Sequence, residues 1–359
     1  MSNLLLAAAA LPLAGLAWWW LRPSTPPAVR PGRQAALRSP APAPAIVPSR
    51  VEAPGREALP KWHWRTEEEM EPDKRDRLLA AIHDIPRPPH ALARMLSPEF
   101  MAKANSNELS ELVQGEPWIA ARMLARVNSP LYGLRQPVTD LGQAVTFLGL
   151  QSVRSICLQT LMAEALQPTQ PGVQKTFDTL WLASAMASEL GTRLDKAMNQ
   201  PAPGTLVTQV VLSFVGALAM ASLIPPTGLS AWLQRDRLAR LRLEQDLLGL
   251  GAAEIGHLLL VGRWSLPTAL ANDVRDAGRM LGAPRAQMDT PHSERLALVY
   301  LCTRLGERLA LGQMASLEGY RLADDDAVDM LHVRTALAPD FLTRLDTALA
   351  SATPMRTAA

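Results

Sequence analysis

Apolar residues beyond Arg77 recur at spacings of three and four, and almost nowhere in the alternation of a half-buried strand. One such face consists of Leu150, Val153, Cys157 and Leu161, with polar residues between them. A spacing of three and four places side chains on one side of an α-helix, whereas a strand requires a period of two. The pattern therefore predicts an all-α body.

Proline residues divide this body into separate helices. Pro117 suits the first turn of a helix, Pro130 forbids the preceding helix to continue, and Pro225 ends a long apolar run. No longer repeat is present, which disfavours a solenoid. We expect one compact helical domain over residues 78–350, followed by a disordered tail over residues 351–359.

The run from Leu206 to Ile224 carries no charge and is long enough to cross a bilayer. Polar residues such as Gln209 interrupt its apolar surface. A span leading outward would also place the arginines of segment 235–242 on the outer side, against the positive-inside rule. A buried core helix is the expectation, and a second membrane span is the alternative.

A second uncharged stretch lies at the N-terminus, where the eighteen residues Leu4–Leu21 end in three tryptophans. No basic residue precedes this stretch and no small-residue cleavage site follows it, which disfavours a secretory signal. Tryptophan favours the headgroup region, and arginines follow from Arg22 onward. The sequence predicts a single-pass anchor over residues 1–21, which contacts the inner (cytoplasmic) membrane through residues 4–21 and leaves the body in the cytoplasm.

Residues 22–77 are predicted to form a linker. The part from Arg22 to Pro60 contains ten prolines and six arginines, a composition that buries too little apolar surface to offset the cost of ordering the chain. It is interpreted as a disordered spacer, with contact between its arginines and anionic lipids as the alternative. Segment 61–77 is dense in charge and is predicted to be a solvated helix or more linker.

Composition excludes several classes of function. The 36 basic and 34 acidic residues give a net charge of +2, so no overall excess favours binding to nucleic acid. Cys157 and Cys302 lie far apart without metal-ligand spacing, which excludes a disulfide scaffold and a thiolate zinc site. Phosphate-binding glycine loops and the GxSxG elbow are also missing from the sequence.

Four segments occur in a specific order: IPRPP at residues 85–89, NSPLYGL at 128–134, AVTFLGL at 144–150 and GRWSLP at 262–267. In this order they resemble the HDOD domain, a helical relative of the HD and HD-GYP metal-dependent phosphohydrolases. The resemblance covers residues 78–350 and implies a bacterial regulatory setting and an HD-like fold. The family-motif residues are Asn128, Ser129, Tyr132, Gly133, Gly149, Gly262, Trp264, Leu266 and Pro267.

These motif residues are interpreted as structural. Asn128 and Ser129 shape a turn at a helix end, and Gly149 is expected to allow close helix packing. Trp264 is expected to be buried, with one hydrogen-bond partner for its indole nitrogen. Tyr132 is left open, because a phenol at a helix end fits either packing or contact with a partner.

The resemblance also implies where the HD metal ligands would fall. The His-Asp pair corresponds to Ser213 and Phe214, an earlier histidine to segment 182–184, and a late aspartate to the neighbourhood of Cys302 and Thr303. HD chemistry needs imidazole and carboxylate ligands to hold metal and activate water. Because none of these positions supplies one, we expect no metal, no other cofactor and no catalytic residue.

The remaining histidines and acidic residues are not expected to form a site. His83 and Asp84 are interpreted as a solvent-exposed pair, His257 as a hydrogen-bonded core residue, and His292 as part of a helix start. The acidic run Asp324–Asp326 is expected to open a terminal helix and to complement its dipole.

The predicted function is a membrane-tethered, non-catalytic signalling module that acts through protein–protein interaction. The alternative is a metal-dependent phosphohydrolase or phosphodiesterase with an atypical site. The protein partner, the oligomeric state and nucleotide binding in the degenerate pocket stay open.

Overall fold

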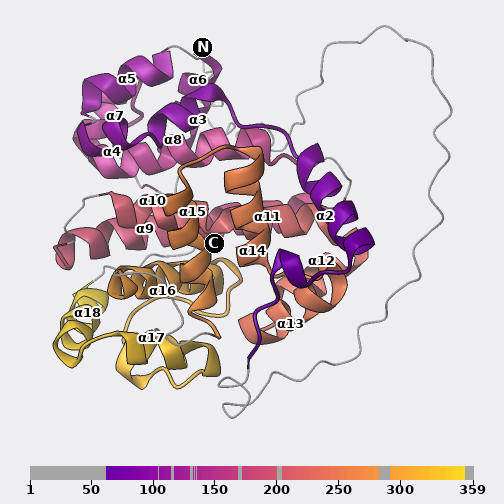
Figure 1. Cartoon of the computed structure of the whole chain (residues 1–359). Helices are drawn as coiled ribbons and strands as arrows, with labels where there is room; N and C mark the ends of the chain where they lie inside the picture. The colour runs from indigo at the N-terminus through magenta and orange to yellow at the C-terminus, as the bar shows by residue number, and fades with distance from the viewer. Residues whose placement is uncertain are drawn as a thin grey trace, which may run out of the picture. The chain divides into compact units, whose positions relative to one another are not determined.

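A computed structural model describes most of the chain beyond the linker (Figure 1). The described residues are 62–103, 105–114, 117–129, 132, 134, 136–168, 172–199, 204–282 and 292–351. The predicted anchor over residues 1–21, the linker up to residue 61, Gly133 and the tail from residue 352 lie outside them. Every regular element in the described part is helical, so the predicted all-α class is confirmed.

The helices before α9 include α8, the first extensively buried helix, and α2, which lies apart from α8 and contacts the turn Leu259–Arg263 (Figure 1). Helices α6 and α7 pack directly on α8, and α5 packs against both of them. This group comprises α2 (Pro72–Asp84), α3 (His90–Met95), α4 (Pro98–Lys103), α5 (Ser106–Gln114), α6 (Pro117–Val127), α7 (Leu141–Leu148) and α8 (Leu150–Ala165).

The long helix α9 runs through the middle of the body, with α8 on one side and α16 on the other (Figure 1). The short helices α10 and α11 pack against α9 and bring the uncharged run of the sequence into the core. The central elements are α9 (Gln174–Ala197), α10 (Thr205–Leu212), α11 (Phe214–Leu223), α12 (Pro226–Leu233) and α13 (Arg237–Leu248).

The C-terminal helices complete the body. Helix α14 packs on α11 and α15, and it continues into a single π-helical turn, Leu259–Arg263. The helices are α14 (Ala252–Leu258), α15 (Thr268–Arg279), α16 (Ser293–Ala310), α17 (Leu331–Ala336) and α18 (Pro339–Ser351). Short 3₁₀ turns are formed by Glu67–Glu69, Leu322–Asp324 and Val328–Met330.

Close helix contacts hold the core together. A Cβ on Gly306 of α16 would lie 2.5 Å from the carbonyl oxygen of Ala183 on α9, so only glycine permits this approach. The uncharged stretch Thr205–Leu223 is the one described helical segment that is long and apolar enough to cross a membrane. Its most apolar window is 83% buried inside the body, which places it in the core, as the sequence favoured.

The folded body begins earlier than the predicted boundary at residue 78. Trp62, Trp64 and Met70 pack against the core, and the guanidinium of Arg65 donates to the carbonyl of Gln245 at 2.8 Å. Residues 62–70 therefore belong to the body and not to the linker, whereas the rest of the segment enters α2, which begins at Pro72, as the solvated-helix alternative held. The high charge density of the sequence does not indicate this packing, because the charged side chains face water while the tryptophans and Met70 cover the body.

Candidate functional site

The segment from Asn128 to Val138 is closed by two hydrogen bonds. The side-chain amide of Asn128 donates to the carbonyl of Val138 at 2.9 Å, and its carbonyl oxygen accepts from the Val138 amide at 2.8 Å. Asn128 therefore shapes the turn, as expected. The amide of Tyr132 donates to the Ser129 carbonyl at 3.2 Å, which adds a further backbone bond within the turn.

Tyr132 packs half-buried against the core, and burial raises the pKa of its phenol to about 12. Tyr132 thus packs on the core, and its partial exposure leaves contact with a partner open as well.

Gly149 joins α7 to α8 in a backbone conformation that only glycine adopts readily. Its φ of +83° lies in the region unfavourable to L-residues, and a Cβ there would meet no atom within 4 Å. The expectation that Gly149 permits close helix packing was wrong. Its role is the sharp change of direction between two helices.

The GRWSLP segment, residues 262–267, contacts the IPRPP segment, residues 85–89. Trp264 is buried and its indole nitrogen donates to the carbonyl of Pro86 at 3.2 Å, as expected for a buried tryptophan. Arg263 donates to the neighbouring carbonyl of Ile85 at 2.9 Å. The IPRPP segment and the GRWSLP segment therefore contact each other in the fold.

Two further residues of the GRWSLP segment contribute to the link between the π-helical turn and α15. Leu266 is buried, and its amide donates to the carbonyl of Leu260 at 2.9 Å. Pro267 is the N-cap residue of α15. Gly262 is exposed, and a Cβ on it would meet nothing within 4 Å, so packing does not demand glycine there.

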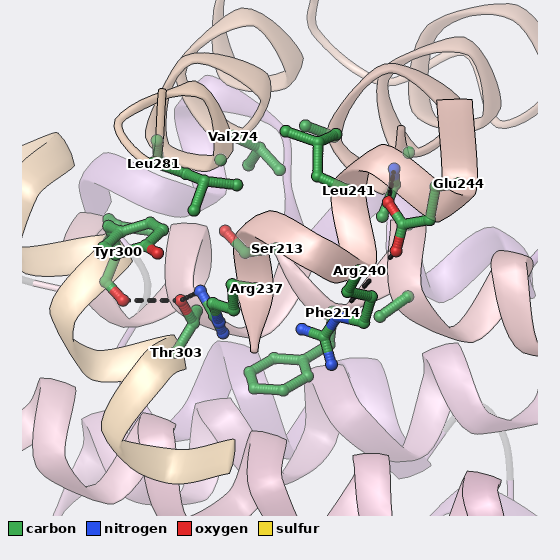
Figure 2. A pocket seen from close by; sticks show the side chains of 18 of the residues that line it. Ser213, Phe214, Arg237, Arg240, Leu241, Glu244, Val274, Leu281, Tyr300 and Thr303 are labelled. Carbon is green, nitrogen blue, oxygen red and sulfur yellow. Dashed lines mark hydrogen bonds and ion pairs between the residues drawn. The ribbon is translucent and has the colours of Figure 1, made fainter. Parts of the chain in front are cut away.

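Three of the positions implied for metal ligands meet in one place. Ser213 and Phe214, at the junction of α10 and α11, and Thr303 on α16 all line a cavity of about 90 Å³ (Figure 2). We call this space the central cavity. The segment that corresponds to the earlier histidine lies elsewhere: Leu182 is exposed, and residues 182–184 do not line the cavity.

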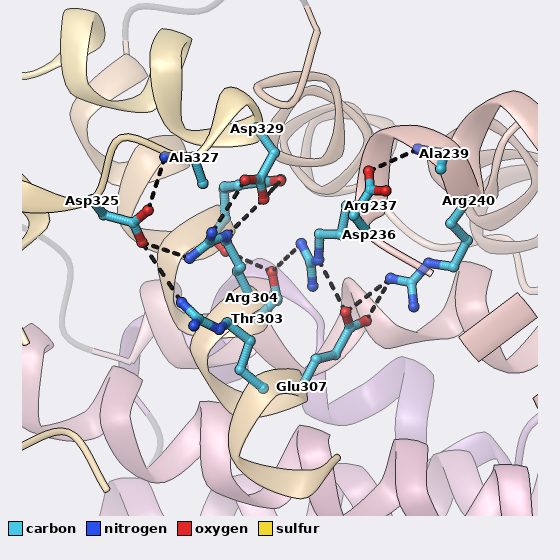
Figure 3. Close-up of polar contacts among 12 residues, drawn as sticks. Asp236, Arg237, Ala239, Arg240, Thr303, Arg304, Glu307, Asp325, Ala327 and Asp329 are labelled. Atoms are coloured by element: carbon cyan, nitrogen blue, oxygen red, sulfur yellow. Dashed lines mark hydrogen bonds and ion pairs between the residues drawn. The ribbon is translucent and has the colours of Figure 1, made fainter. Parts of the chain in front are cut away.

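An ion-pair cluster that the sequence did not predict forms one wall of the central cavity. Glu307 accepts from Nε of Arg237 at 3.0 Å and from Nη2 of Arg240 at 2.8 and 2.9 Å (Figure 3). Burial raises the pKa of Glu307, but the two arginines outweigh it and hold the pKa below 4.5. Glu307 is therefore ionised and shared by two cations.

The second carboxyl group in the wall, that of Glu244, also accepts hydrogen bonds on both oxygens. Glu244 accepts from the indole nitrogen of Trp232 at 3.0 Å and from the amide of Ala252 at 2.8 Å. Burial raises its pKa, against the attraction of Arg240, whose Nε lies 3.9 Å away. Burial thus disfavours the charged form of Glu244, the other carboxyl group among the described residues that line the cavity.

The donors around the central cavity do not fit a divalent metal ion. Both carboxyl groups already accept hydrogen bonds, and two guanidinium groups lie beside them. The hydroxyls of Ser213 and Thr303 donate to the carbonyls of Gln209 and Tyr300, at 2.7 and 2.8 Å. Nowhere in the described part of the chain do three His, Cys, Asp or Glu side chains gather in a possible metal-binding group.

The remaining predicted positions are placed as follows. His83 and Asp84 are both exposed at the end of α2, as expected. His257 contacts the side-chain oxygen of Asn272 at 2.9 Å, and His292 immediately precedes α16. The expectation that Asp324–Asp326 opens a helix was wrong. Asp325 instead accepts from Arg304 at 2.8 Å, because this loop folds back on α16.

Comparison with protein families gives a match over more than half of the chain: the HDOD domain model matches residues 85–279. The chain belongs to the HDOD family. A comparison with curated proteins found no match. Among solved structures, an HDOD domain protein with unknown function from Geobacter sulfurreducens is 16% identical, with a TM-score of 0.50. The similarity covers 76% of this chain and 95% of the Geobacter chain and supports the fold.

Two further solved structures resemble this HDOD protein. A protein from Marinobacter aquaeolei VT8, provisionally named a signal transduction protein, is 20% identical, with a TM-score of 0.47 and coverage of 77% of this chain and 66% of its own. A protein from Shewanella amazonensis SB2B, provisionally named a phosphohydrolase, is 18% identical, with a TM-score of 0.47 and coverage of 76% and 98%. Their provisional names differ, so they do not decide between signalling and hydrolysis.

Proposed function

We propose that this HDOD protein is a membrane-tethered regulatory module that acts through protein–protein interaction and has no metal-dependent hydrolase activity. The observation that carries the proposal is the chemistry of the central cavity. Ser213, Phe214 and Thr303 occupy the positions implied for ligands, and the cluster of Arg237, Arg240 and Glu307 forms the wall beside them.

Hydrolysis requires a group that activates water, and the cavity offers none in a suitable state. Glu307 is ionised, but both of its oxygens accept hydrogen bonds from arginine, which lowers its proton affinity. Glu244 has both oxygens engaged by the body's own donors. All four oxygens of the two carboxyl groups already accept hydrogen bonds from the body, and these contacts support a role in holding the fold.

A hydrolysis assay tests the non-catalytic part of the proposal. The full chain, purified in mild detergent, is incubated with bis(p-nitrophenyl) phosphate and manganese, with and without a chelator. We expect no turnover above the protein-free rate in either condition. Turnover that disappears with the chelator would favour the alternative, an atypical phosphohydrolase, and loss of that turnover in Ser213→Ala would assign it to the central cavity.

Cell fractionation tests the tether. The proposal rests on the uncharged segment 4–21 and the arginines that follow it. Deleting residues 1–21 should move the protein from the membrane fraction to the soluble fraction without reducing its helical circular dichroism, because the body has its own core. A full chain that is already soluble, or a truncated chain that stays in membranes, would contradict the proposed anchor.

A further inference from the structure

A larger cavity lies beside the central cavity, on the other side of the same ion pair. It has a volume of about 390 Å³, within the range of small-molecule sites, and Arg237 and Glu307 line both spaces. We call it the arginine cavity, because Arg235, Arg237, Arg304 and Arg308 all line it. Four positive charges around one cavity need acidic partners or a bound anion to neutralise them.

One of the four arginines is fully neutralised. Arg304 donates to Asp329 at 2.6 and 3.1 Å and to Asp325 at 2.8 Å (Figure 3). Asp329 also accepts from the hydroxyl of Tyr300 at 3.0 Å, and Asp325 from that of Tyr320 at 2.9 Å. These two carboxylates are therefore committed to Arg304 and have little capacity left for the other cations.

The other three arginines are incompletely neutralised. Arg237 shares the single carboxylate of Glu307 with Arg240. Among the described acidic residues Arg308 pairs with Asp325, at 3.8 Å, and Asp325 is already held by Arg304. Within the described part of the chain, the Arg235 side chain makes no hydrogen bond or ion pair, and its Nε is buried without a partner.

A buried guanidinium nitrogen without an acceptor is costly, because it has lost water and gained nothing in return. Asp236 is the remaining acidic residue of the lining, but it is exposed and its carboxylate caps α13 through the amide of Ala239 at 2.9 Å. The cavity thus combines spare arginine donors with enough room for a ligand. Guanidinium groups bind phosphate with high geometric preference.

We propose that the arginine cavity binds a phosphate-bearing small molecule, with Arg235 and Arg308 holding the phosphate and Arg237 contributing from the shared wall. The lining also contains apolar side chains, among them Leu233 and Leu311. Apolar side chains beside a phosphate site suit a ligand with an organic portion, such as a nucleotide, better than inorganic phosphate. This inference goes beyond the proposed function and does not depend on it.

Calorimetric titration of the full chain in mild detergent tests the inference with three probes: inorganic phosphate, GMP and glycerol 3-phosphate. We expect GMP to bind at least tenfold more tightly than inorganic phosphate. Tighter binding of glycerol 3-phosphate than of GMP would also support the site and would identify a lipid headgroup as the source of the phosphate. No measurable binding of any probe at millimolar concentration would overturn the proposal.

Matched variants locate the binding. Arg235→Gln and Arg308→Gln should each weaken GMP binding about tenfold or more, since a hydrogen bond to a charged group is worth about 1.5–3 kcal/mol and 1.4 kcal/mol corresponds to tenfold. The control is Arg242→Gln, an exposed arginine on α13 outside the cavity lining, and its affinity should equal the parent's. Equal losses in all three variants, with unchanged melting temperatures, would show non-specific attraction and overturn the site.

Discussion

Replacing Glu307 with glutamine should destabilise the body strongly, because Glu307 is the shared counter-ion of two buried arginines. The side chains of Glu307, Arg240 and Arg237 are only 8%, 9% and 15% exposed. Removing one partner of a buried ion pair typically costs about 3–5 kcal/mol. Glutamine keeps the size of the side chain and one accepting oxygen, so we expect the lower end, about 3 kcal/mol.

The assay is thermal and urea unfolding of the parent and of Glu307→Gln. A loss of about 3 kcal/mol should lower the melting temperature by roughly 6–12 °C in a body of this size. The matched control is Glu189→Gln, which removes an ion pair with Arg193 at 3.0 Å whose side chains are 29% and 35% exposed. A partly exposed pair contributes less than about 1 kcal/mol, so the control should melt close to the parent.

The pH dependence of the difference is a second readout. The pKa of Glu307 lies below 4.5 in the folded protein, so its contribution to stability is present at neutral pH and disappears as the pH falls through the folded pKa. The gap between parent and Glu307→Gln should therefore narrow below pH 4.5. A gap of under 1 kcal/mol at neutral pH, or one that widens in acid, would refute the reasoning.

Three further predictions follow from packing and burial. Gly216→Ala should unfold or severely destabilise the body, because its Cβ would overlap the carbonyl oxygen of Ala252, whereas Gly262→Ala should leave the melting temperature nearly unchanged, since nothing lies within 4 Å. Burial raises the pKa of Asp195 above 3.8, so the free energy of unfolding falls as the pH rises and this carboxyl group ionises. Asp195→Asn should remove this loss of stability in urea unfolding at increasing pH. An equal loss in the variant would show that Asp195 does not cause it. Removing residues 62–77 together with the preceding chain should lower the melting temperature relative to a chain that starts at residue 62, and equal melting would contradict their packing on the core.

The helical class and the meeting of Ser213, Phe214 and Thr303 were accessible from the sequence. Periodicity reports which face of a helix is buried, and the family resemblance carried the positions of a distant site. The cluster around Glu307 was not accessible, because Arg237 and Arg240 lie 70 and 67 residues before it in the chain. The spacing of Arg240 and Glu244 by one helical turn is a local signal of an ion pair, but it does not reach Glu307.

Two errors share a physical cause. Residues 62–70 and the run Asp324–Asp326 are both rich in charge, and a high charge density favours solvent exposure or helix-dipole complementation. In the folded chain, the tryptophans of the first segment cover the core, and Asp325 of the second is committed to Arg304 and Tyr320. Charge density describes the local composition of a segment, whereas the burial of its side chains depends on partners that are distant in sequence.

Metal analysis of the purified full chain tests the central claim most directly. The protein is produced in medium supplemented with manganese and iron, purified without chelator, and analysed by inductively coupled plasma mass spectrometry. The account predicts far less than one metal ion per chain, because arginines and committed carboxylates surround Ser213, Phe214 and Thr303. One or two tightly held ions per chain, lost when Ser213 is replaced by alanine, would contradict it.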